Sequence, residues 1–164
     1  MISKLPAEYI IDGDVAIHHT AVIDATAIIR GPAIIGEDAL IGCFALLRGG
    51  TFVGKNSIIG AHGEFKTSVI MHNSVCGHFN FVGESLIGSN VNLEAGAVLA
   101  NHYNELKDKN VHVKYKNESI DTGCVKFGSV IGDGSRIGAN AVLFPGILLP
   151  PDTVVNRLQL VESW

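Results

Sequence analysis

A repeat of six residues constrains the fold of this chain more than any other feature of its sequence. From Ile11 to Phe65 an aliphatic or aromatic residue recurs at every sixth position, and a mostly small side chain follows each one four residues later. Helices give spacings near 3.6 and isolated strands alternate by two, so a strict period of six is typical of a repeat architecture in which each hexad is one short strand and turn. We therefore predict an all-β solenoid. The large positions are Ile11, Ile17, Ile23, Ile29, Ile35, Ile41, Leu47, Val53, Ile59 and Phe65.

Three hexads would form one triangular coil of about 18 residues, and successive coils would stack at about 4.8 Å, the spacing of paired strands. The repeat slips by one residue after Phe65, resumes at Ile70 and slips again before Ile87, which indicates bulges or local bends. It vanishes in a polar, lysine-rich segment over residues 101–128 and returns at Ile131. That segment is predicted to be an insertion into the solenoid.

These boundaries predict a single domain over residues 1–164. Its parts are repeats over residues 11–100, an inserted loop over residues 101–128, closing coils over residues 129–156 and a C-terminal tail over residues 157–164. Within the insertion we expect one small strand, from Val111 to Tyr115. We expect the tail to cap the open end of the solenoid or to reach another subunit, because its sequence breaks the repeat.

Composition and charge narrow the classes of function. The chain has 164 residues, a net charge of −4 and a pI near 5.9, which give no general attraction to nucleic acid or anionic membranes. No segment approaches the roughly 20 apolar residues of a membrane span. Cys43, Cys76 and Cys124 are far apart and lack CxxC spacing, so neither a disulfide framework nor a zinc knuckle is indicated. We expect a soluble cytoplasmic protein.

Two cations are predicted to stand above one another on the solenoid. Arg48 and Lys66 occupy the same position of successive coils, where like charges repel. A bound anion such as a phosphate would relieve the repulsion; alternatively, two flexible side chains would splay into water. His78 would lie across one corner from the pair, because Gly83 stacks on Lys66. With Asn92 one coil above, a candidate base, an amide and two cations could border one groove.

Metal binding is an alternative use of the histidines. His62, His72, His78 and His102 could be ligands, since three histidines on a solenoid can hold a catalytic zinc. His72 and His78 are one hexad apart and on different faces, which argues against a shared ion, so we predict no metal. The sequence also lacks a GxGxxG after a strand, a P-loop and a GxSxG elbow, so it supports neither a nucleotide-binding fold nor a hydrolase.

The stretch GHFNFVGESLIGSNVNLEAGAVLAN, from Gly77 to Asn101, resembles a signature of the hexapeptide-repeat acyltransferases. Within that family the likeness is to the carboxyl-terminal acetyltransferase domain of bifunctional sugar-1-phosphate nucleotidylyltransferases, of the glucosamine-1-phosphate acetyltransferase type, and it runs from about Ile23 to Val155. The resemblance implies a left-handed parallel β-helix of hexapeptide repeats, with one long inserted loop, that assembles as a homotrimer. The left hand comes from the resemblance alone, since crossovers between parallel strands are normally right-handed.

The resemblance also implies roles for individual residues that contact the acceptor. His78 matches the general base. Arg48 and Lys66 match the residues that hold the sugar phosphate, Asn92 matches a sugar-binding asparagine, and Lys107 falls where the family has a phosphate-side lysine.

Around the cofactor the match is less complete. Asn101 matches the asparagine near the acetyl-CoA thioester, but His102 follows it where the family has a tyrosine, and Ala139 replaces a serine that often contacts the cofactor. Phe81 replaces a tyrosine whose hydroxyl is expected to touch the sugar, and Glu94 replaces the glycine of the usual NxGAG. A lost hydrogen bond of this kind would change the acceptor that the site prefers.

Together these features predict an enzyme that transfers an acetyl group from acetyl-CoA to an amino-sugar phosphate or nucleotide-sugar precursor, with no metal required. A non-catalytic sugar-nucleotide-binding or assembly subunit of a nucleotidylyltransferase is the main alternative, and a zinc enzyme like the carbonic anhydrases is a third. The family's amino-terminal nucleotidylyltransferase domain is not in this sequence. We therefore expect a stand-alone enzyme, a fragment, or a relative that works beside a separate nucleotidylyltransferase.

Overall fold

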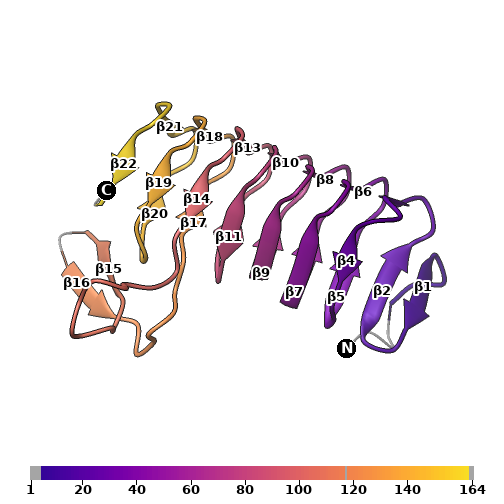
Figure 1. The fold of residues 1–164 in the computed structure, drawn as a ribbon, viewed down its shortest axis with the longest axis horizontal. Helices are drawn as coiled ribbons and strands as arrows, with labels where there is room; N and C mark the ends of the chain where they lie inside the picture. Colours follow the sequence, from indigo (N-terminus) through magenta and orange to yellow (C-terminus); the bar gives the residue numbers. More distant parts are fainter. Residues whose placement is uncertain (1–4, 117, 163–164) are drawn as a thin grey trace.

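The computed structural model describes residues 5–116 and 118–162 of the chain as an elongated stack of coils, with the first and last described residues at opposite ends (Figure 1). The fold is the left-handed parallel β-helix of hexapeptide repeats that the resemblance implied. Secondary structure in the described part consists of 22 strands. No helix there is long and apolar enough to cross a membrane.

Each coil contributes one short strand to each of three walls, and strands within a wall pair in parallel. Wall 1 contains β2 (Val15–His18), β5 (Ala33–Ile35), the second halves of β7 (Leu46–Val53) and β9 (Glu64–Ile70), β12 (Leu86–Ile87), β17 (Val130–Ile131) and β20 (Leu148–Leu149). Wall 2 contains β3 (Val22–Ile23), β6 (Leu40–Ile41), β8 (Ile58–Ile59), β10 (Val75–Cys76), β13 (Asn92–Leu93), β18 (Arg136–Ile137) and β21 (Val154–Val155). Wall 3 contains β4 (Ile28–Ile29), the first halves of β7 and β9, β11 (Phe81–Gly83), β14 (Val98–Leu99), β19 (Val142–Leu143) and β22 (Leu160–Val161).

The large residues of the hexads fill the interior, as the period predicted. One hydrophobic cluster runs along the axis, and small side chains such as Ala45 and Ala97 are fully buried beside it. The largest fully buried side chains are Phe65, Ile35, Ile41, Leu47, Ile59, Ile70, Ile87, Leu93, Leu99, Ile131, Ile137 and Leu143. Because each coil donates its large residues to the same interior columns, the core is continuous across coils.

The slip in the repeat marks a bulge between walls 3 and 1. β7 and β9 run around this corner without interruption, and their pairing shifts register between Arg48 and Thr51. The extra residue lies in β7, where Gly49 and Gly50 have φ of 70° and 97°. Side chains with a Cβ avoid that region, so glycine suits the bulge. The bulge predicted near Phe65 is thus confirmed.

Both ends of the solenoid differ from the sequence prediction. Ile11 keeps the spacing of six but lies in β1 (Tyr9–Asp12), which pairs antiparallel with β2, and it is 46% exposed; the first coil therefore begins at β2. At the other end Val161 pairs in parallel with β19 and is 3% exposed. Within the predicted tail, residues 157–161 form a further turn and strand of the stack. Residues 163–164 lie outside the described part.

The insertion leaves the solenoid after β14 and returns at β17. It carries an antiparallel hairpin of β15 (His112–Tyr115) and β16 (Glu118–Asp121), which lies beside the last coils (Figure 1). The predicted strand is confirmed, whereas β16 was missed because all four of its residues are exposed and show no alternation. The Tyr103 hydroxyl donates a hydrogen bond to the Pro145 carbonyl at 3.0 Å, which ties the insertion to the closing coils.

The thin core predicts a steep loss of stability on truncation of an interior side chain. Phe65 is 0% exposed and Phe79 is 63% exposed. We expect Phe65→Ala to lower the free energy of unfolding by about 3–5 kcal/mol, because the ring leaves a cavity that the stacked backbone cannot fill. The control Phe79→Ala should change it by less than about 1 kcal/mol. Denaturant unfolding at one protein concentration measures both, and equal losses would contradict the prediction.

Candidate functional site

The two predicted cations stand in register on wall 3, next to the corner with wall 1. Arg48 pairs with Lys66, and Lys66 pairs with Gly83 on the following coil. The stacking predicted by counting residues is therefore confirmed. It places a guanidinium and an ammonium group on neighbouring strands, about 4.8 Å apart at the backbone.

Each of these cations has a carboxylate partner. Arg48 donates from Nε and Nη2 to Glu64 Oε1, at 2.8 and 2.5 Å. Lys66 forms an ion pair with Glu84, whose carboxylate also accepts a hydrogen bond from the Asn101 amide. Arg48, Glu64, Lys66, Glu84 and Asn101 form what we call the charged cluster.

The carboxylates change the electrostatics of the predicted anion site. They relieve the repulsion between Arg48 and Lys66 that would otherwise favour a bound anion. Burial lowers the pKa of Lys66, and the nearby charges of Lys126 and Arg48 lower it further. Sequence analysis missed both acidic partners, although Glu64 stands two residues before Lys66 on a strand and hence on the same face. Glu84 follows the strand residue that stacks on Lys66, so counting residues could have found it too.

The candidate base lies at the corner between walls 2 and 3, three residues before β11. The His78 carbonyl accepts a hydrogen bond from Gly96 N at 2.8 Å, and the Ala95 carbonyl accepts one from Asn140 N at 3.0 Å. These bonds align His78, Ala95 and Ala139 at the same position of three successive coils. His78 and Ala139 are therefore on one corner, two coils or roughly 10 Å apart.

An exposed column of rings lies along the same corner. Phe44, His62 and Phe79 stack in series, with ring centroids 5.0 and 5.3 Å apart. All three have φ between 55° and 59°, a region that bulky side chains rarely adopt. The His78 ring meets Phe79 edge-on, with centroids 6.4 Å apart. Wall 3 thus has the candidate base and aromatic surface along one edge and the charged cluster along the other.

The four histidines proposed as alternative metal ligands occupy separate environments. His62 stacks between two phenylalanine rings, and His72 Nδ1 accepts a hydrogen bond from Lys55 N at 3.0 Å. His102 Nδ1 lies 3.0 Å from the Val125 carbonyl. Across residues 5–116 and 118–162, no group of three or more His, Cys, Asp or Glu side chains could hold a metal ion.

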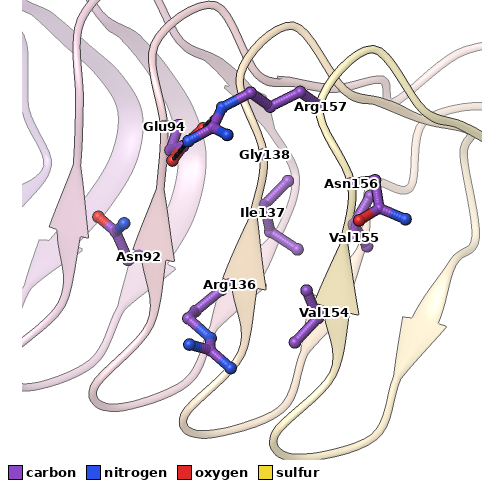
Figure 2. Close-up of a pocket in the computed structure, with 9 residues that line it drawn as sticks. All are labelled: Asn92, Glu94, Arg136, Ile137, Gly138, Val154, Val155, Asn156 and Arg157. Carbon is purple, nitrogen blue, oxygen red and sulfur yellow. Dashed lines mark hydrogen bonds and ion pairs between the residues drawn. The ribbon is translucent and has the colours of Figure 1, made fainter.

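Asn92 lies apart from the charged cluster. It belongs to β13 in wall 2 and lines a shallow pocket of about 270 Å³ together with Glu94, Arg136, Asn156 and Arg157 (Figure 2). Neither the charged cluster nor the candidate base lines this pocket. Within one chain, the structure does not bring the predicted sugar-binding asparagine and the predicted phosphate-binding cations into one cavity.

A two-pronged ion pair borders one side of this pocket. Arg157 donates from Nε to Glu94 Oε2 at 2.8 Å and from Nη2 to Oε1 at 2.6 Å, and its side chain reaches across to Glu94 in Figure 2. The Ala139 N–H donates to Glu94 Oε2 at 2.9 Å. The Arg157 guanidinium, with the Ala139 N–H, holds the pKa of Glu94 below its usual value. Sequence analysis singled out Glu94 only as a departure and missed Arg157, which it placed in a tail.

The remaining predicted residues lie on wall 3 and the insertion. Phe81, in β11, pairs with Glu64 below it and Val98 above it, so its ring stands next to the charged cluster. His102 and Lys107 belong to the insertion, and Lys107 is exposed. The roles of these three residues stay predictions.

Known proteins share the repeat and part of the sequence. Residues 32–62 and 128–155 match the hexapeptide repeat of succinyl-transferase. Over 100 residues the chain is 38% identical to a bifunctional sugar-1-phosphate nucleotidylyltransferase/acetyltransferase of Sulfurisphaera tokodaii, a match that covers 57% of this chain and 24% of that protein. It is 32% identical over 100 residues to the bifunctional protein GlmU of Methanococcus vannielii, covering 61% of this chain and 23% of the relative. The chain thus spans about a quarter of the length of these curated relatives.

A solved structure supports the fold independently of these sequence matches. It is that of a serine-to-alanine mutant of AntD, an N-acyltransferase from Bacillus cereus, in complex with dTDP-4-amino-4,6-dideoxyglucose and coenzyme A. The match has a TM-score of 0.50 at 15% identity and covers 92% of this chain and 72% of the other, so the likeness is one of fold. These findings confirm the resemblance: the chain contains hexapeptide repeats, and its sequence is similar to part of the bifunctional sugar-1-phosphate nucleotidylyltransferase/acetyltransferases.

Proposed function

We propose that this protein is an N-acetyltransferase that uses acetyl-CoA to acetylate an amino-sugar phosphate or a nucleotide-sugar precursor. The observation that carries the proposal is the arrangement of wall 3, with His78 along one edge and the stacked Arg48 and Lys66 along the other. A base at one edge and cations at the other suit an acceptor with an amine at one end and a phosphate at the other. The name of the Sulfurisphaera tokodaii relative, which includes acetyltransferase, supports the same chemistry.

Acetyl-CoA would supply the acetyl group as a thioester. His78 would accept a proton from the amine as the nitrogen attacks the thioester carbonyl, and would return that proton to the departing thiolate. A backbone N–H would stabilise the oxyanion. The amine would attack the thioester directly, so no covalent enzyme intermediate would form. Base catalysis of this kind contributes about 100- to 10,000-fold to the rate.

The charged cluster retains donors for a phosphate despite its carboxylates. A guanidinium has five N–H donors, and only Nε and Nη2 of Arg48 contact Glu64. The Lys66 ammonium has three donors, one of which faces Glu84. Because Lys126 also lies close enough to lower the pKa of Lys66, three cations face two carboxylates here. A phosphate would be bound by this excess of positive charge.

We also propose that the protein assembles as a homotrimer, with active grooves between subunits. Wall 2 exposes a column of aliphatic side chains on neighbouring strands, namely Val22, Leu40, Ile58 and Val75, which are 61, 39, 37 and 36% exposed. Contiguous exposed apolar surface of this kind favours burial against another chain. A neighbouring subunit would also bring groups such as Lys107 to a groove that one chain leaves incomplete.

A second candidate function is a non-catalytic sugar-nucleotide-binding or assembly subunit that works beside a separate nucleotidylyltransferase. The bond between Glu94 and the Ala139 N–H favours it, because that N–H is then unavailable to a cofactor. Phe81 favours it as well, since a phenyl ring provides no hydroxyl for the acceptor.

The enzyme proposal predicts a specific loss when the base is removed. We expect His78→Ala to lower turnover of an amino-sugar phosphate with acetyl-CoA by at least about 100-fold, while the acceptor still binds, because base catalysis acts in the transition state. Free thiol release measures turnover. The control His19→Ala, at the far N-terminal end, should keep wild-type turnover. Equal activity of the His78 variant would remove His78 from the mechanism, and an inactive wild type across hexosamine phosphates would favour the binding subunit.

The charged cluster predicts where the phosphate binds. Lys66→Ala should weaken binding of an amino-sugar phosphate by about tenfold, because it removes a charge-assisted hydrogen bond and leaves Glu84 to repel the anion. Lys55→Ala is the matched control, since Lys55 forms an exposed ion pair with Glu37 at 2.6 Å, away from the cluster. Calorimetric titration compares the affinities. Unchanged affinity of the Lys66 variant would place the phosphate elsewhere.

The exposed column on wall 2 predicts the oligomeric state. Light scattering at micromolar concentration should give about three times the chain mass of 17.4 kDa. Ile58→Asp, which puts a charge in the middle of the column, should reduce the mass toward that of one chain, whereas Lys114→Asp on the hairpin should not. A stable wild-type monomer would refute the trimer.

A further inference from the structure

The Glu94 carboxylate makes contacts across three successive coils. Glu94 lies directly after β13, and its carboxylate accepts a hydrogen bond from the Ala139 N–H on the next coil. Arg157, on the coil after that, holds the carboxylate in a two-pronged ion pair. Arg157 is 63 residues away in the sequence. Glu94 is one-third exposed, so the carboxylate lies along the outside of the corner where walls 2 and 3 meet.

Other N–H groups at the same corner position are not occupied in this way. In the coils before Ala139 the equivalent residues are Cys43, Ala61, His78 and Ala95, and none of their N–H groups donates a hydrogen bond to residues 5–116 or 118–162. The corner therefore offers donors at intervals of about 4.8 Å, one per coil. At Ala139, by contrast, the protein's own Glu94 carboxylate accepts the hydrogen bond of the N–H.

The ion pair contributes little to holding the coils together. Backbone bonds already join them, from Glu94 N to the Ile137 carbonyl at 2.8 Å and from Gly138 N to the Val155 carbonyl at 2.9 Å. Ile137 and Val155 are also buried in the core. The Arg157 side chain is 72% exposed, and exposed ion pairs contribute little to stability. Bracing the stack is therefore a weak reason for this arrangement.

We propose that Glu94, clamped by Arg157, is an autoinhibitory clip that competes with the cofactor for the Ala139 N–H. The inference rests on the proposed function and on the predicted place of Ala139 beside the cofactor. The arm of coenzyme A that carries the thiol contains two amide groups, whose carbonyls need donors once they leave water. A carboxylate fixed on one of those donors must be displaced before the arm can lie along the corner. Glu94 thus sets the affinity for the cofactor without touching the acceptor.

The clip predicts that its removal strengthens cofactor binding. Glu94→Gly should lower the dissociation constant of coenzyme A by at least about fivefold, because the Ala139 N–H then gains an acceptor without losing one. Glu94→Ala is a second variant in case glycine disturbs the turn. The double variant Glu94→Gly with Arg157→Gln should keep the gain, which separates release of the N–H from new contacts between a freed arginine and the phosphates of coenzyme A.

Calorimetric titration with coenzyme A measures these affinities, and thermal unfolding checks that each variant is folded. Glu37→Gly is the matched control, since it breaks an exposed ion pair with Lys55 elsewhere on the solenoid. Tighter binding by both Glu94→Gly and the double variant, with wild-type affinity in the control, supports the clip. Equal affinity of wild type and Glu94→Gly, or a gain lost in the double variant, overturns the clip and leaves the proposed function standing. Failure of every folded variant to bind coenzyme A at millimolar concentration overturns the proposed function and the clip with it.

Discussion

Parallel pairing between successive coils is the interaction on which the rest of this structure depends. Most wall strands contain only two residues, and such short strands are not stable alone. They persist because each coil bonds to the next, as from Ile58 N to the Ser74 carbonyl at 2.8 Å and from Gly60 N to the Cys76 carbonyl at 2.7 Å. Interior side chains such as Ile59 and Cys76 then stack in columns from which water is excluded. Position within the hexad consequently decides whether a residue faces the core or the solvent.

The same pairing places side chains of equivalent positions in columns along the stack. Residues at equivalent positions are one strand spacing apart, so like groups accumulate: cations at Arg48 and Lys66, rings along Phe44, His62 and Phe79. Stacked charges need counter-charges, which this chain supplies from the same wall and the adjoining turn. Stacked rings instead gain contact area, which helps to offset the cost of their left-handed backbone conformation. A rigid ladder thereby presents groups that a flexible loop could not hold at fixed distances.

Two departures from the family signature have different physical consequences in this chain. Phe81 lacks the hydroxyl of the family's tyrosine and places an apolar ring beside the charged cluster. Glu94 adds a carboxylate that finds specific partners in Arg157 and the Ala139 N–H. In the proposed acetyltransferase, the first would bear on which acceptor is preferred, and the second on access of the cofactor. The proposed acetyltransferase would therefore differ from its relatives at both ends of the site, while the scaffold between them stays the same.

The sequence by itself determined the interior and the stacking, because inward positions recur in every coil and can be found by counting residues. Arg48 above Lys66 followed from that count alone. Counting could not determine the direction of a strand, so Ile11 kept the spacing yet lies in an antiparallel hairpin. Nor could it show that Glu94 meets Arg157, because that contact depends on how far two long side chains reach across the intervening coil. Tertiary structure decided those contacts, since the repeat fixes where each backbone segment lies and leaves each exposed side chain several partners within reach.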